Sequence, residues 1–179
     1  MSGHSHSRTI KHRKDAVDAK RGKIFSKISS LIIVAAKEKG GDPETNPKLK
    51  LAIEKAKAAN MPKDNIERAI KRGAGQLGGA NIEEFIYEAY GPNGAALIIK
   101  GITDNKNRTL AEIKHTLNRF GGKLAEAGSV KYLFDRKGDD WQPKYPLEIS
   151  PKNKEQLEKL FELLNENEDV QEIYSNLKD

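Results

Sequence analysis

The 179-residue sequence contains no cysteine, and its apolar residues never form a long run. The absence of thiols excludes a disulfide framework, a thiolate metal site and a cysteine nucleophile, and it fits a reducing compartment. The longest uninterrupted apolar segment, residues 31–36, is too short to span a bilayer. The basic N-terminus lacks the apolar stretch of a secretory signal. We therefore expect a cytoplasmic protein with no membrane partner.

Patterns that would support catalysis or metal binding are equally scarce. The sequence has four histidines: His4, His6, His12 and His115. No two of them have the spacing of helical metal ligands, and residues 73–78 match G-x-G-x-x-G after a predicted helix, which excludes a dinucleotide-binding fold. Asp104 and His115 are a conceivable acid–base pair, but no spacing requires that role. We predict a non-enzyme with no catalytic residue, metal, cofactor or small-molecule substrate.

Charge of opposite sign is concentrated toward the two ends of the chain. Residues 1–73 hold 18 Lys and Arg against 8 Asp and Glu, a net charge of +10. Residues 74–138 are close to balance at +2, whereas residues 139–179 carry a net charge of −6. The first segment therefore attracts a polyanion and the last one repels it. Basic residues that merely solvate helices would be scattered, so the pattern favours a nucleic-acid partner.

The hydrophobic pattern predicts a flexible basic arm followed by a helical domain. Residues 1–14 have no hydrophobic period, whereas apolar residues recur at helical spacing over residues 15–73. Three helices are predicted from their end signals: the first stops at Gly40-Gly41, the second starts at Asn46-Pro47, and the third runs from near Pro62 to Gly73. Each helix is amphipathic and too short to be stable alone, so the three must pack together.

A linker at residues 74–81 precedes a region in which strand periodicity alternates with helical periodicity. The predicted elements are a hairpin of strands near 85–89 and 95–103, a helix at 107–120, a strand at 130–134, a short strand at 147–149, a helix starting at Ser150-Pro151, and a strand at 172–177. The predicted inward face of the helix at 107–120 consists of Leu110, Ile113, Leu117 and Phe120. Residues 138–146, with one glycine and two prolines, are predicted to be a connection.

These elements define an α+β protein. The order of the second region, ββαβ followed by βαβ, is that of two split βαβ units that close into one sheet with helices on one face. The predicted fold is therefore an N-terminal three-helix domain followed by a ferredoxin-like α/β sandwich over residues 82–179.

Basic residues of the arm and of the first helix are the leading candidates for nucleic-acid contact. They are Lys11, His12, Arg13, Lys14, Lys20, Arg21 and Lys23. A mobile basic arm beside a basic helix start can neutralise several phosphates, and each neutralised phosphate releases counterions. Such contacts position a protein without reading the base sequence. The alternative interpretation of the arm is a solvated tail without a ligand.

Two further groups could bind an anion. Arg68, Lys71 and Arg72 lie on the third helix, where Arg68 and Arg72 are i,i+4 neighbours that repel each other unless an anion lies between them. Arg108 lies in a strand-to-helix turn at residues 103–109, and the backbone N–H groups of a helix start attract anions. The alternative interpretations are an ordinary solvent-exposed helix face and simple helix capping by Asn or Asp.

Taken in order along the chain, its motifs resemble those of the YebC/PmpR family. The segments that carry the resemblance are Gly3-His4-Ser5, Ile10-Lys11-His12-Arg13-Lys14, Asp18-Ala19-Lys20-Arg21-Gly22-Lys23-Ile24-Phe25, Gly40-Gly41-Asp42-Pro43, Ala56-Lys57-Ala58-Ala59-Asn60-Met61-Pro62-Lys63, Tyr90-Gly91-Pro92, Thr103-Asp104-Asn105, Asn107-Arg108-Thr109 and Gly128-Ser129-Val130. Although the arm is basic, rich in hydroxyls and free of acid up to residue 14, as transit peptides are, its match to the family implies that it belongs to the mature protein.

The resemblance implies a regulator of gene expression. Family members are described as DNA-binding transcriptional regulators, while others act on the ribosome and assist the synthesis of difficult nascent chains such as proline runs. Both activities use a basic helical domain against a nucleic-acid backbone, so duplex DNA and ribosomal RNA both stay open as partners. The resemblance carries the binding role to Lys11, His12, Arg13, Lys14, Lys20, Arg21 and Lys23, and in second rank to Asn105, Asn107 and Arg108.

The chain departs from the family pattern in two places. After Gly3-His4-Ser5 the family usually has Lys-Trp, where this sequence has His6-Ser7, so an aromatic residue of the arm is missing. The chain is also shorter than family members, which look like three domains with the third inserted within the second. Residues 138–146 are expected to stand in place of that third domain.

The sequence therefore predicts a DNA-binding transcriptional regulator of the YebC/PmpR type, with a ribosome-associated translation factor as the alternative. Two hypotheses from other classes stay open. One is an enzyme acting on RNA, in which Asp104 and His115 would supply the chemistry. The other is an interaction protein whose acidic residues 139–179 bind a basic protein partner.

Overall fold

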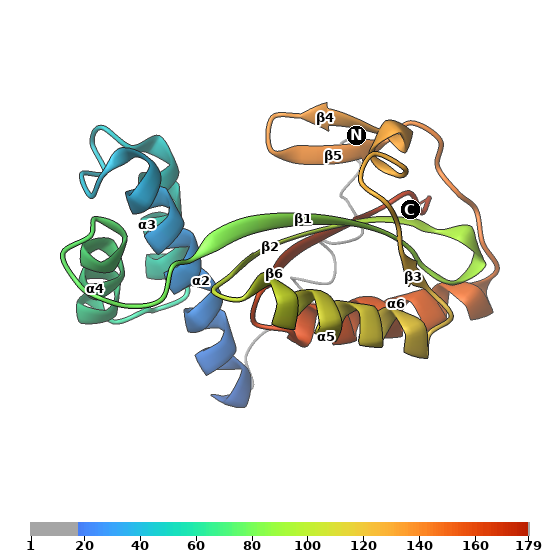
Figure 1. Ribbon diagram of the computed structural model, residues 1–179, viewed down its shortest axis with the longest axis horizontal. Helices are drawn as coiled ribbons and strands as arrows, with labels where there is room; N and C mark the ends of the chain where they lie inside the picture. Colours follow the sequence, from blue (N-terminus) through green and yellow to red (C-terminus); the bar gives the residue numbers. More distant parts are fainter. Residues whose placement is uncertain (1–17, 179) are drawn as a thin grey trace. The chain divides into compact units, whose positions relative to one another are not determined.

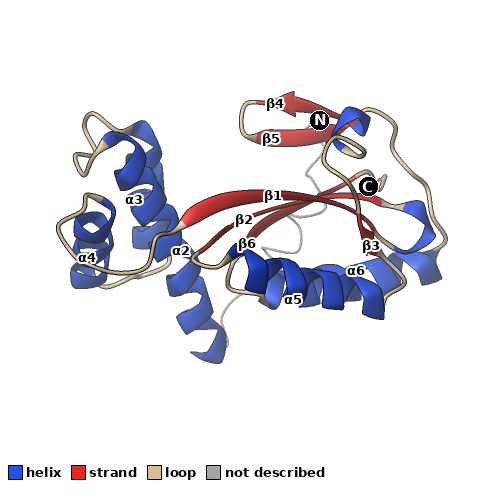
Figure 2. Cartoon of the chain, in the orientation of Figure 1, coloured by secondary structure: helices blue, strands red, loops and turns tan. Residues whose placement is uncertain are grey.

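The computed structural model describes residues 18–178, so the arm predicted at residues 1–14, with Lys11, His12, Arg13 and Lys14, lies outside the described residues. The described chain divides into two compact units: a helical unit within residues 18–84 and an α/β unit built from residues 85–101 and 106–178. Figure 2 shows helices packed together in the first unit and helices against a sheet in the second. The α+β class predicted from the sequence is confirmed.

Three helices form the helical unit, as the sequence predicts. They are α2 (Asp18–Lys39), α3 (Pro47–Ala58) and α4 (Lys63–Gly73) (Figure 1). All three contribute buried apolar side chains to one core: Ile28, Ile32, Ile33, Ala35, Ala36, Leu49, Ala52, Ala56, Met61, Ile66 and Ala69. The predicted end signals are also present. Gly40 follows α2 with a φ of +91°, and the Asn46 side chain caps α3 by accepting a hydrogen bond from the Leu49 N–H.

The α/β unit is built on a four-stranded sheet with the order β3-β1-β2-β6. The strands are β1 (Glu83–Tyr90), β2 (Ala96–Thr103), β3 (Lys123–Leu124) and β6 (Val170–Ser175), with a short helix η1 (Pro92–Gly94) between β1 and β2. Helices α5 (Lys106–Arg119) and α6 (Pro151–Glu166) cover one face of the sheet (Figure 1). There Leu97 and Ile99 of β2 pack with Leu117 of α5 and Leu160 of α6. This arrangement is the predicted two-layer α/β sandwich.

A separate β-hairpin covers part of the opposite face of the sheet. It consists of β4 (Phe134–Lys137) and β5 (Asp140–Pro143) and follows a short helix η2 (Lys131–Leu133) (Figure 1). Phe134 packs there with Ala96, Ile98 and Tyr174 of the sheet. β2 has apolar neighbours on both faces of the sheet. This explains why its sequence is a nearly continuous apolar run and does not alternate apolar with polar residues.

Four details of the predicted secondary structure and its buried faces are wrong. The strand predicted at 130–134 is η2 plus the start of β4, and the third strand of the sheet is β3, two residues long. The predicted connection at 138–146 contains β5, since only Gly138 and Asp139 separate the two strands of the hairpin. The strand predicted at 147–149 is reduced to one parallel bridge between Leu147 and Leu177. On α5 the inward face contains Thr109 in place of the exposed Leu110, whereas Ile113 and Leu117 are buried as predicted.

A buried carboxylate explains why residues 130–134 do not extend the sheet. Glu88, on β1, is 4% exposed and accepts hydrogen bonds from the backbone N–H groups of Gly128 (2.6 Å), Val130 (2.9 Å) and Lys131 (2.7 Å). These N–H groups are therefore unavailable to a neighbouring strand. Burial alone would raise the pKa of Glu88, but the three N–H donors, helped by the Lys131 charge, outweigh burial and hold its pKa below the usual value.

We expect Glu88→Gln to lower the free energy of unfolding at pH 7 by about 1–3 kcal/mol, because an amide offers one acceptor oxygen and turns an NH₂ toward an N–H donor. The folded-state pKa lies below the unfolded value of about 4.3, so the stabilisation is complete above that pH and is lost as the pH falls through the folded pKa. Urea unfolding at pH 7 and pH 3 should show a difference between the two proteins that shrinks in acid. The exposed Glu126→Gln serves as the control, and equal stabilities of Glu88→Gln and wild type at pH 7 would refute the role of Glu88.

Candidate nucleic-acid interface

The first turns of α2 carry the candidate cations Lys20, Arg21 and Lys23. Arg21 and Lys23 are exposed and Lys20 is half-buried. Lys27, which the sequence analysis missed, extends the series, and the i, i+3, i+7 spacing of Lys20, Lys23 and Lys27 places these three on one helix face. Gly22 lies among them, and a Cβ built on it would meet no described atom within 4 Å. The structure therefore leaves room beside this basic stretch for a close-lying ligand.

This basic stretch lies apart from the point where α2 packs against α4. A Cβ on Gly73 of α4 would lie 2.4 Å from the Ile33 carbonyl oxygen and 2.7 Å from the Ala36 Cβ, so the two backbones are in close contact there. Ile33 follows Lys23 by ten residues, about 15 Å along a helix axis. Figure 1 shows the N-terminal turns of α2 extending beyond α3 and α4 within the helical unit. The cations of α2 and α4 thus form two patches of one unit.

α3 contributes exposed lysines that the sequence analysis did not select. Lys50, Lys55 and Lys57 are exposed, and Glu54 is the only acid on the helix. Their signal in the sequence is the excess of lysine over acid between residues 47 and 58, a helix whose apolar stripe already identifies its outer face. The basic surface of the helical unit therefore includes α3.

Lys48, on the same helix, is neutralised within the unit. Its ammonium lies 2.9 Å from a Glu38 carboxylate oxygen and 3.1 Å from one of Glu84. Burial alone would lower the pKa of Lys48, but the hydrogen bonds from Glu38 and Glu84 outweigh it and leave the pKa above its usual value. An ammonium held by two carboxylates is a poor candidate for phosphate contact.

The three candidate cations of α4 differ in their surroundings. Arg68 and Lys71 are exposed, and no ion-pair partner of either lies among the described residues. Arg72 is half-buried and donates to the Ala80 carbonyl oxygen (3.3 Å), with its guanidinium against the backbone of Gly79. Arg72 therefore holds the segment that follows α4, whereas Arg68 and Lys71 face solvent.

The strand-to-helix turn at residues 103–109 places its arginine against an acid. The Thr103 hydroxyl accepts a hydrogen bond from the Asn105 N–H (3.0 Å), and both Asn105 and Asn107 are exposed. The Arg108 guanidinium donates to Asp169 at 2.8 Å, and the Asp169 carboxylate is 18% exposed. The Thr109 hydroxyl donates to the same oxygen at 2.6 Å. Asp169 therefore neutralises the charge of Arg108, the residue predicted from the sequence to bind a phosphate.

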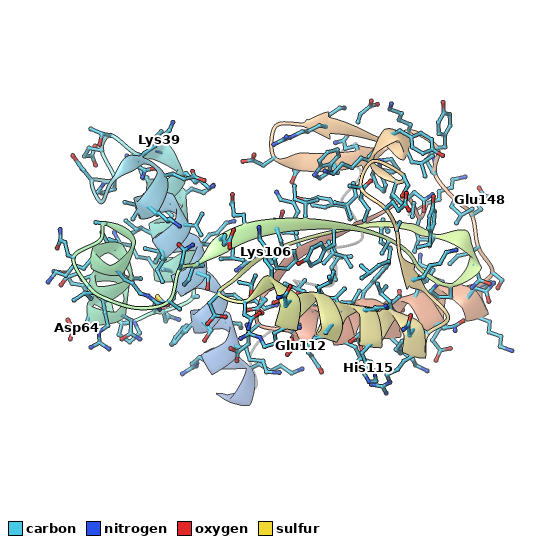
Figure 3. The ribbon with its side chains drawn as sticks, viewed as in Figure 1. Lys39, Asp64, Lys106, Glu112, His115 and Glu148 are labelled. Carbon is cyan, nitrogen blue, oxygen red and sulfur yellow. The ribbon has the colours of Figure 1, made fainter. Side chains whose placement is uncertain are left out.

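The structure gathers few groups with catalytic or metal-binding chemistry. His115 points away from the sheet on the outer side of α5 (Figure 3) and is exposed. Within residues 18–178 no three His, Cys, Asp or Glu side chains come together in a way that could hold a metal ion. Over the same residues, no helix is long and apolar enough to cross a membrane.

Comparison with known protein families gives two matches that together cover most of the chain. Residues 5–76 match the TACO1/YebC protein N-terminal domain, and residues 82–139 match the TACO1/YebC second and third domain. The second match ends at Asp139, in the turn between β4 and β5.

Individual relatives agree with this assignment. A probable transcriptional regulatory protein of Thermoanaerobacter pseudethanolicus is 42% identical over 239 aligned positions, which cover 99% of this chain and 97% of the relative. A probable transcriptional regulatory protein of Thermosipho melanesiensis is 62% identical over 138 residues, which cover 77% of this chain and 55% of the relative. The crystal structure of a conserved hypothetical protein from Aquifex aeolicus matches with a TM-score of 0.88 at 35% identity and covers 97% of each chain.

Proposed function

The chain belongs to the TACO1/YebC family, and we propose that it regulates gene expression by binding nucleic acid, with duplex DNA as its target. Its relatives are named as probable transcriptional regulatory proteins, which supports a binding role without catalysis. The observation that carries the proposal is the concentration of positive charge in the helical unit and the arm, with a net charge of +10 over residues 1–73.

The contact surface that we propose consists of the arm and the outer faces of the helical unit. Exposed cations on α2, α3 and α4 lie in that unit: Arg21, Lys23, Lys50, Lys55, Lys57, Arg68 and Lys71. The arm residues Lys11, His12, Arg13 and Lys14 join them in the proposal, as does Lys20. Asn105 and Asn107 stay secondary candidates because they are exposed, whereas Arg72 and Arg108 rank last because they already bind Ala80 and Asp169. Contacts of this kind bind the phosphate backbone and tolerate many sequences.

Removing two of these cations should change the salt dependence of DNA binding. We expect Arg21→Ala/Lys23→Ala to weaken binding to duplex DNA and to reduce the slope of log K against log salt by about 0.9 for each lost phosphate contact. Lys11→Ala/Arg13→Ala/Lys14→Ala should reduce the slope by about one unit per contact in the same way. Fluorescence anisotropy with labelled duplex DNA at several salt concentrations measures both changes.

The matched control removes two cations from the acidic part of the chain. Lys152 and Lys154 lie in the first turn of α6, within residues 139–179, which carry a net charge of −6. Lys152→Ala/Lys154→Ala changes the net charge by the same amount as Arg21→Ala/Lys23→Ala. It should leave the slope unchanged. A slope that changes equally in both double variants would mean that net charge alone governs binding, and a slope that changes in neither would remove α2 from the interface.

Sedimentation of a DNase-treated lysate separates DNA from ribosomal RNA as the target. If the protein co-migrates with ribosomes or large subunits and leaves them at high salt, the translation role replaces the proposed one. Arg21→Ala/Lys23→Ala should then lose that co-migration while Lys152→Ala/Lys154→Ala keeps it. If the protein stays at the top of the gradient, duplex DNA stays the proposed target.

We also propose that residues 138–146 stand in place of the family's third domain. The alignment to the Thermoanaerobacter relative has 239 positions, 60 more than the 179 residues of this chain, so at least 60 positions have no residue here. The match to the second and third domain ends at Asp139, and β5 begins at Asp140. In the proposed function, nucleic-acid contact therefore depends on the helical unit and not on an inserted domain.

A further inference from the structure

The open end of the β4–β5 hairpin exposes two tyrosines. Tyr132 is 63% exposed and Tyr145 is 70% exposed, more than any other large apolar or aromatic side chain among the described residues. Neither ring stacks on another aromatic ring within residues 18–178. Two strongly exposed aromatic rings in one hairpin are a candidate contact surface for a partner. The residues around the two tyrosines indicate the chemistry of such a partner.

The hairpin brings together the two chain segments that carry the tyrosines. Phe134 pairs with Pro143, and the Lys144 N–H donates to the Leu133 carbonyl oxygen at 2.9 Å, which continues the same pairing by one residue. Tyr132 precedes Leu133 and Tyr145 follows Lys144, so the two tyrosines flank this hydrogen bond, with Tyr132 in η2. Both rings are exposed at the end of the hairpin where the chain enters and leaves.

Each tyrosine has a lysine as its neighbour in the chain, and neither has an acidic neighbour. Residues 131–133 and 144–146 contain Lys131 and Lys144 but no Asp or Glu. The nearest acid to Lys144 is Asp135 at 3.7 Å, and a surface pair of this kind contributes little, so the ammonium can exchange it for a phosphate. The other acids of the hairpin, Asp139 and Asp140, lie at its closed end, where the Tyr174 hydroxyl donates to Asp140 at 3.2 Å.

We propose that Tyr132 and Tyr145, with Lys131 and Lys144, bind single-stranded nucleic acid. Unpaired bases stack on the tyrosine rings, and the phosphates between them lie on the lysines, which is how sequence-tolerant single-strand binders combine aromatic side chains with cations. A duplex keeps its bases stacked inside and cannot offer them to exposed rings. The site consists of residues of the α/β unit only, so it does not depend on duplex binding by the helical unit.

The test compares two double variants that differ in ring stacking. Tyr132→Ala/Tyr145→Ala removes both rings, whereas Tyr132→Phe/Tyr145→Phe keeps them and loses only the hydroxyls. Anisotropy with a labelled oligouridine of about 12 nucleotides should show at least about tenfold weaker binding for the alanine variant and wild-type binding for the phenylalanine variant. Because both side chains are exposed, neither variant should alter the thermal unfolding of the protein.

The single tryptophan, which lies in the same hairpin, gives an independent readout through its contact with Lys131. Trp141 lies in β5, and Lys131 and Arg136 lie 6.0 Å and 5.7 Å from its ring centre. Oligouridine should therefore change the Trp141 emission of the wild type and of Arg21→Ala/Lys23→Ala, but not that of the alanine variant. Oligouridine binding that is unchanged in Tyr132→Ala/Tyr145→Ala would overturn the site, whatever the outcome of the duplex experiments. A wild-type protein that ignores oligouridine but self-associates through the two tyrosines would overturn it in favour of a second copy as the occupant.

Discussion

Gly101→Ala should destabilise the α/β unit by about 3 kcal/mol or more, a loss large enough to unfold much of it at moderate temperature. A Cβ at this position would lie 2.0 Å from the Asp169 carbonyl oxygen and 2.3 Å from the Phe85 ring. The ring belongs to the core, and the carbonyl belongs to the backbone just before β6. Neither the carbonyl nor the ring can move without disrupting the sheet, so the protein cannot accommodate the added methyl group.

The backbone at Gly101 also explains why the loss should affect the turn at residues 103–109. The pairing of β2 with β6 shifts between Lys100 and Gly101, from Lys100 opposite Glu172 to Gly101 opposite Val170. This irregularity brings Asp169 over Gly101, and the Asp169 carboxylate binds Arg108 and Thr109. An alanine at 101 should therefore loosen the turn at residues 103–109 as well.

Thermal and urea unfolding measured by far-UV circular dichroism test this expectation. Gly78→Ala is the control, because a Cβ there meets no described atom and the φ of Gly78 is not in the left-handed region. The control should stay within about 0.5 kcal/mol of the wild type. If Gly101→Ala unfolds at the same urea concentration as Gly78→Ala, the close approach at Gly101 is not a constraint.

Asn46→Ala should lower the stability of the helical unit by about 2–4 kcal/mol. The Asn46 side chain is fully buried, and its amide donates to the carbonyl oxygens of Ala35 (2.8 Å) and Gly40 (2.9 Å) while its oxygen caps α3 at Leu49 (3.1 Å). One residue therefore joins the end of α2 to the start of α3. Alanine removes the acceptor of the Leu49 N–H. It also leaves a void in place of the amide group.

A second substitution separates the two roles of Asn46. Asn46→Asp keeps an oxygen for the Leu49 N–H but turns a carboxylate toward the carbonyls of Ala35 and Gly40. If the link between the helices matters, the aspartate variant should be destabilised about as much as the alanine variant in urea unfolding. An aspartate variant as stable as wild type would show that capping alone accounts for the role. Asn118→Ala, at an exposed position of α5, controls for the loss of an asparagine.

Local signals were sufficient for the helices and the first hairpin. Gly40 and the Asn46-Pro47 pair mark helix ends through backbone geometry that involves near neighbours only, and the structure has them where the sequence predicts. The third strand was predicted wrongly because its decisive partner is distant. Glu88 binds Val130, 42 residues along the chain, and no periodicity within 130–134 reveals such a contact. β3, with two residues, is too short to leave a periodic signal.

The candidate site was predictable to a similar extent. The basic character of the helical unit follows from composition, and the exposure of Arg21, Lys23 and Arg68 agrees with a surface role. What composition cannot reveal is which cations already have partners. Arg108 pairs with Asp169 across 61 residues, and Lys48 pairs with Glu84 across 36. Such ion pairs depend on the fold, so ranking the candidates requires the structure.

Lys137 and Asp140 are the last paired residues of the β4–β5 hairpin, and Gly138, with a φ of +62°, helps to close it in a two-residue turn. Paired Cα atoms of neighbouring strands lie about 5 Å apart. An insert whose own two ends lie that close can take the place of the turn without altering the strands on either side. On the proposal that residues 138–146 stand in place of a third domain, one deletion or insertion at this turn would be sufficient to remove or add a folded domain while the hairpin keeps its strands.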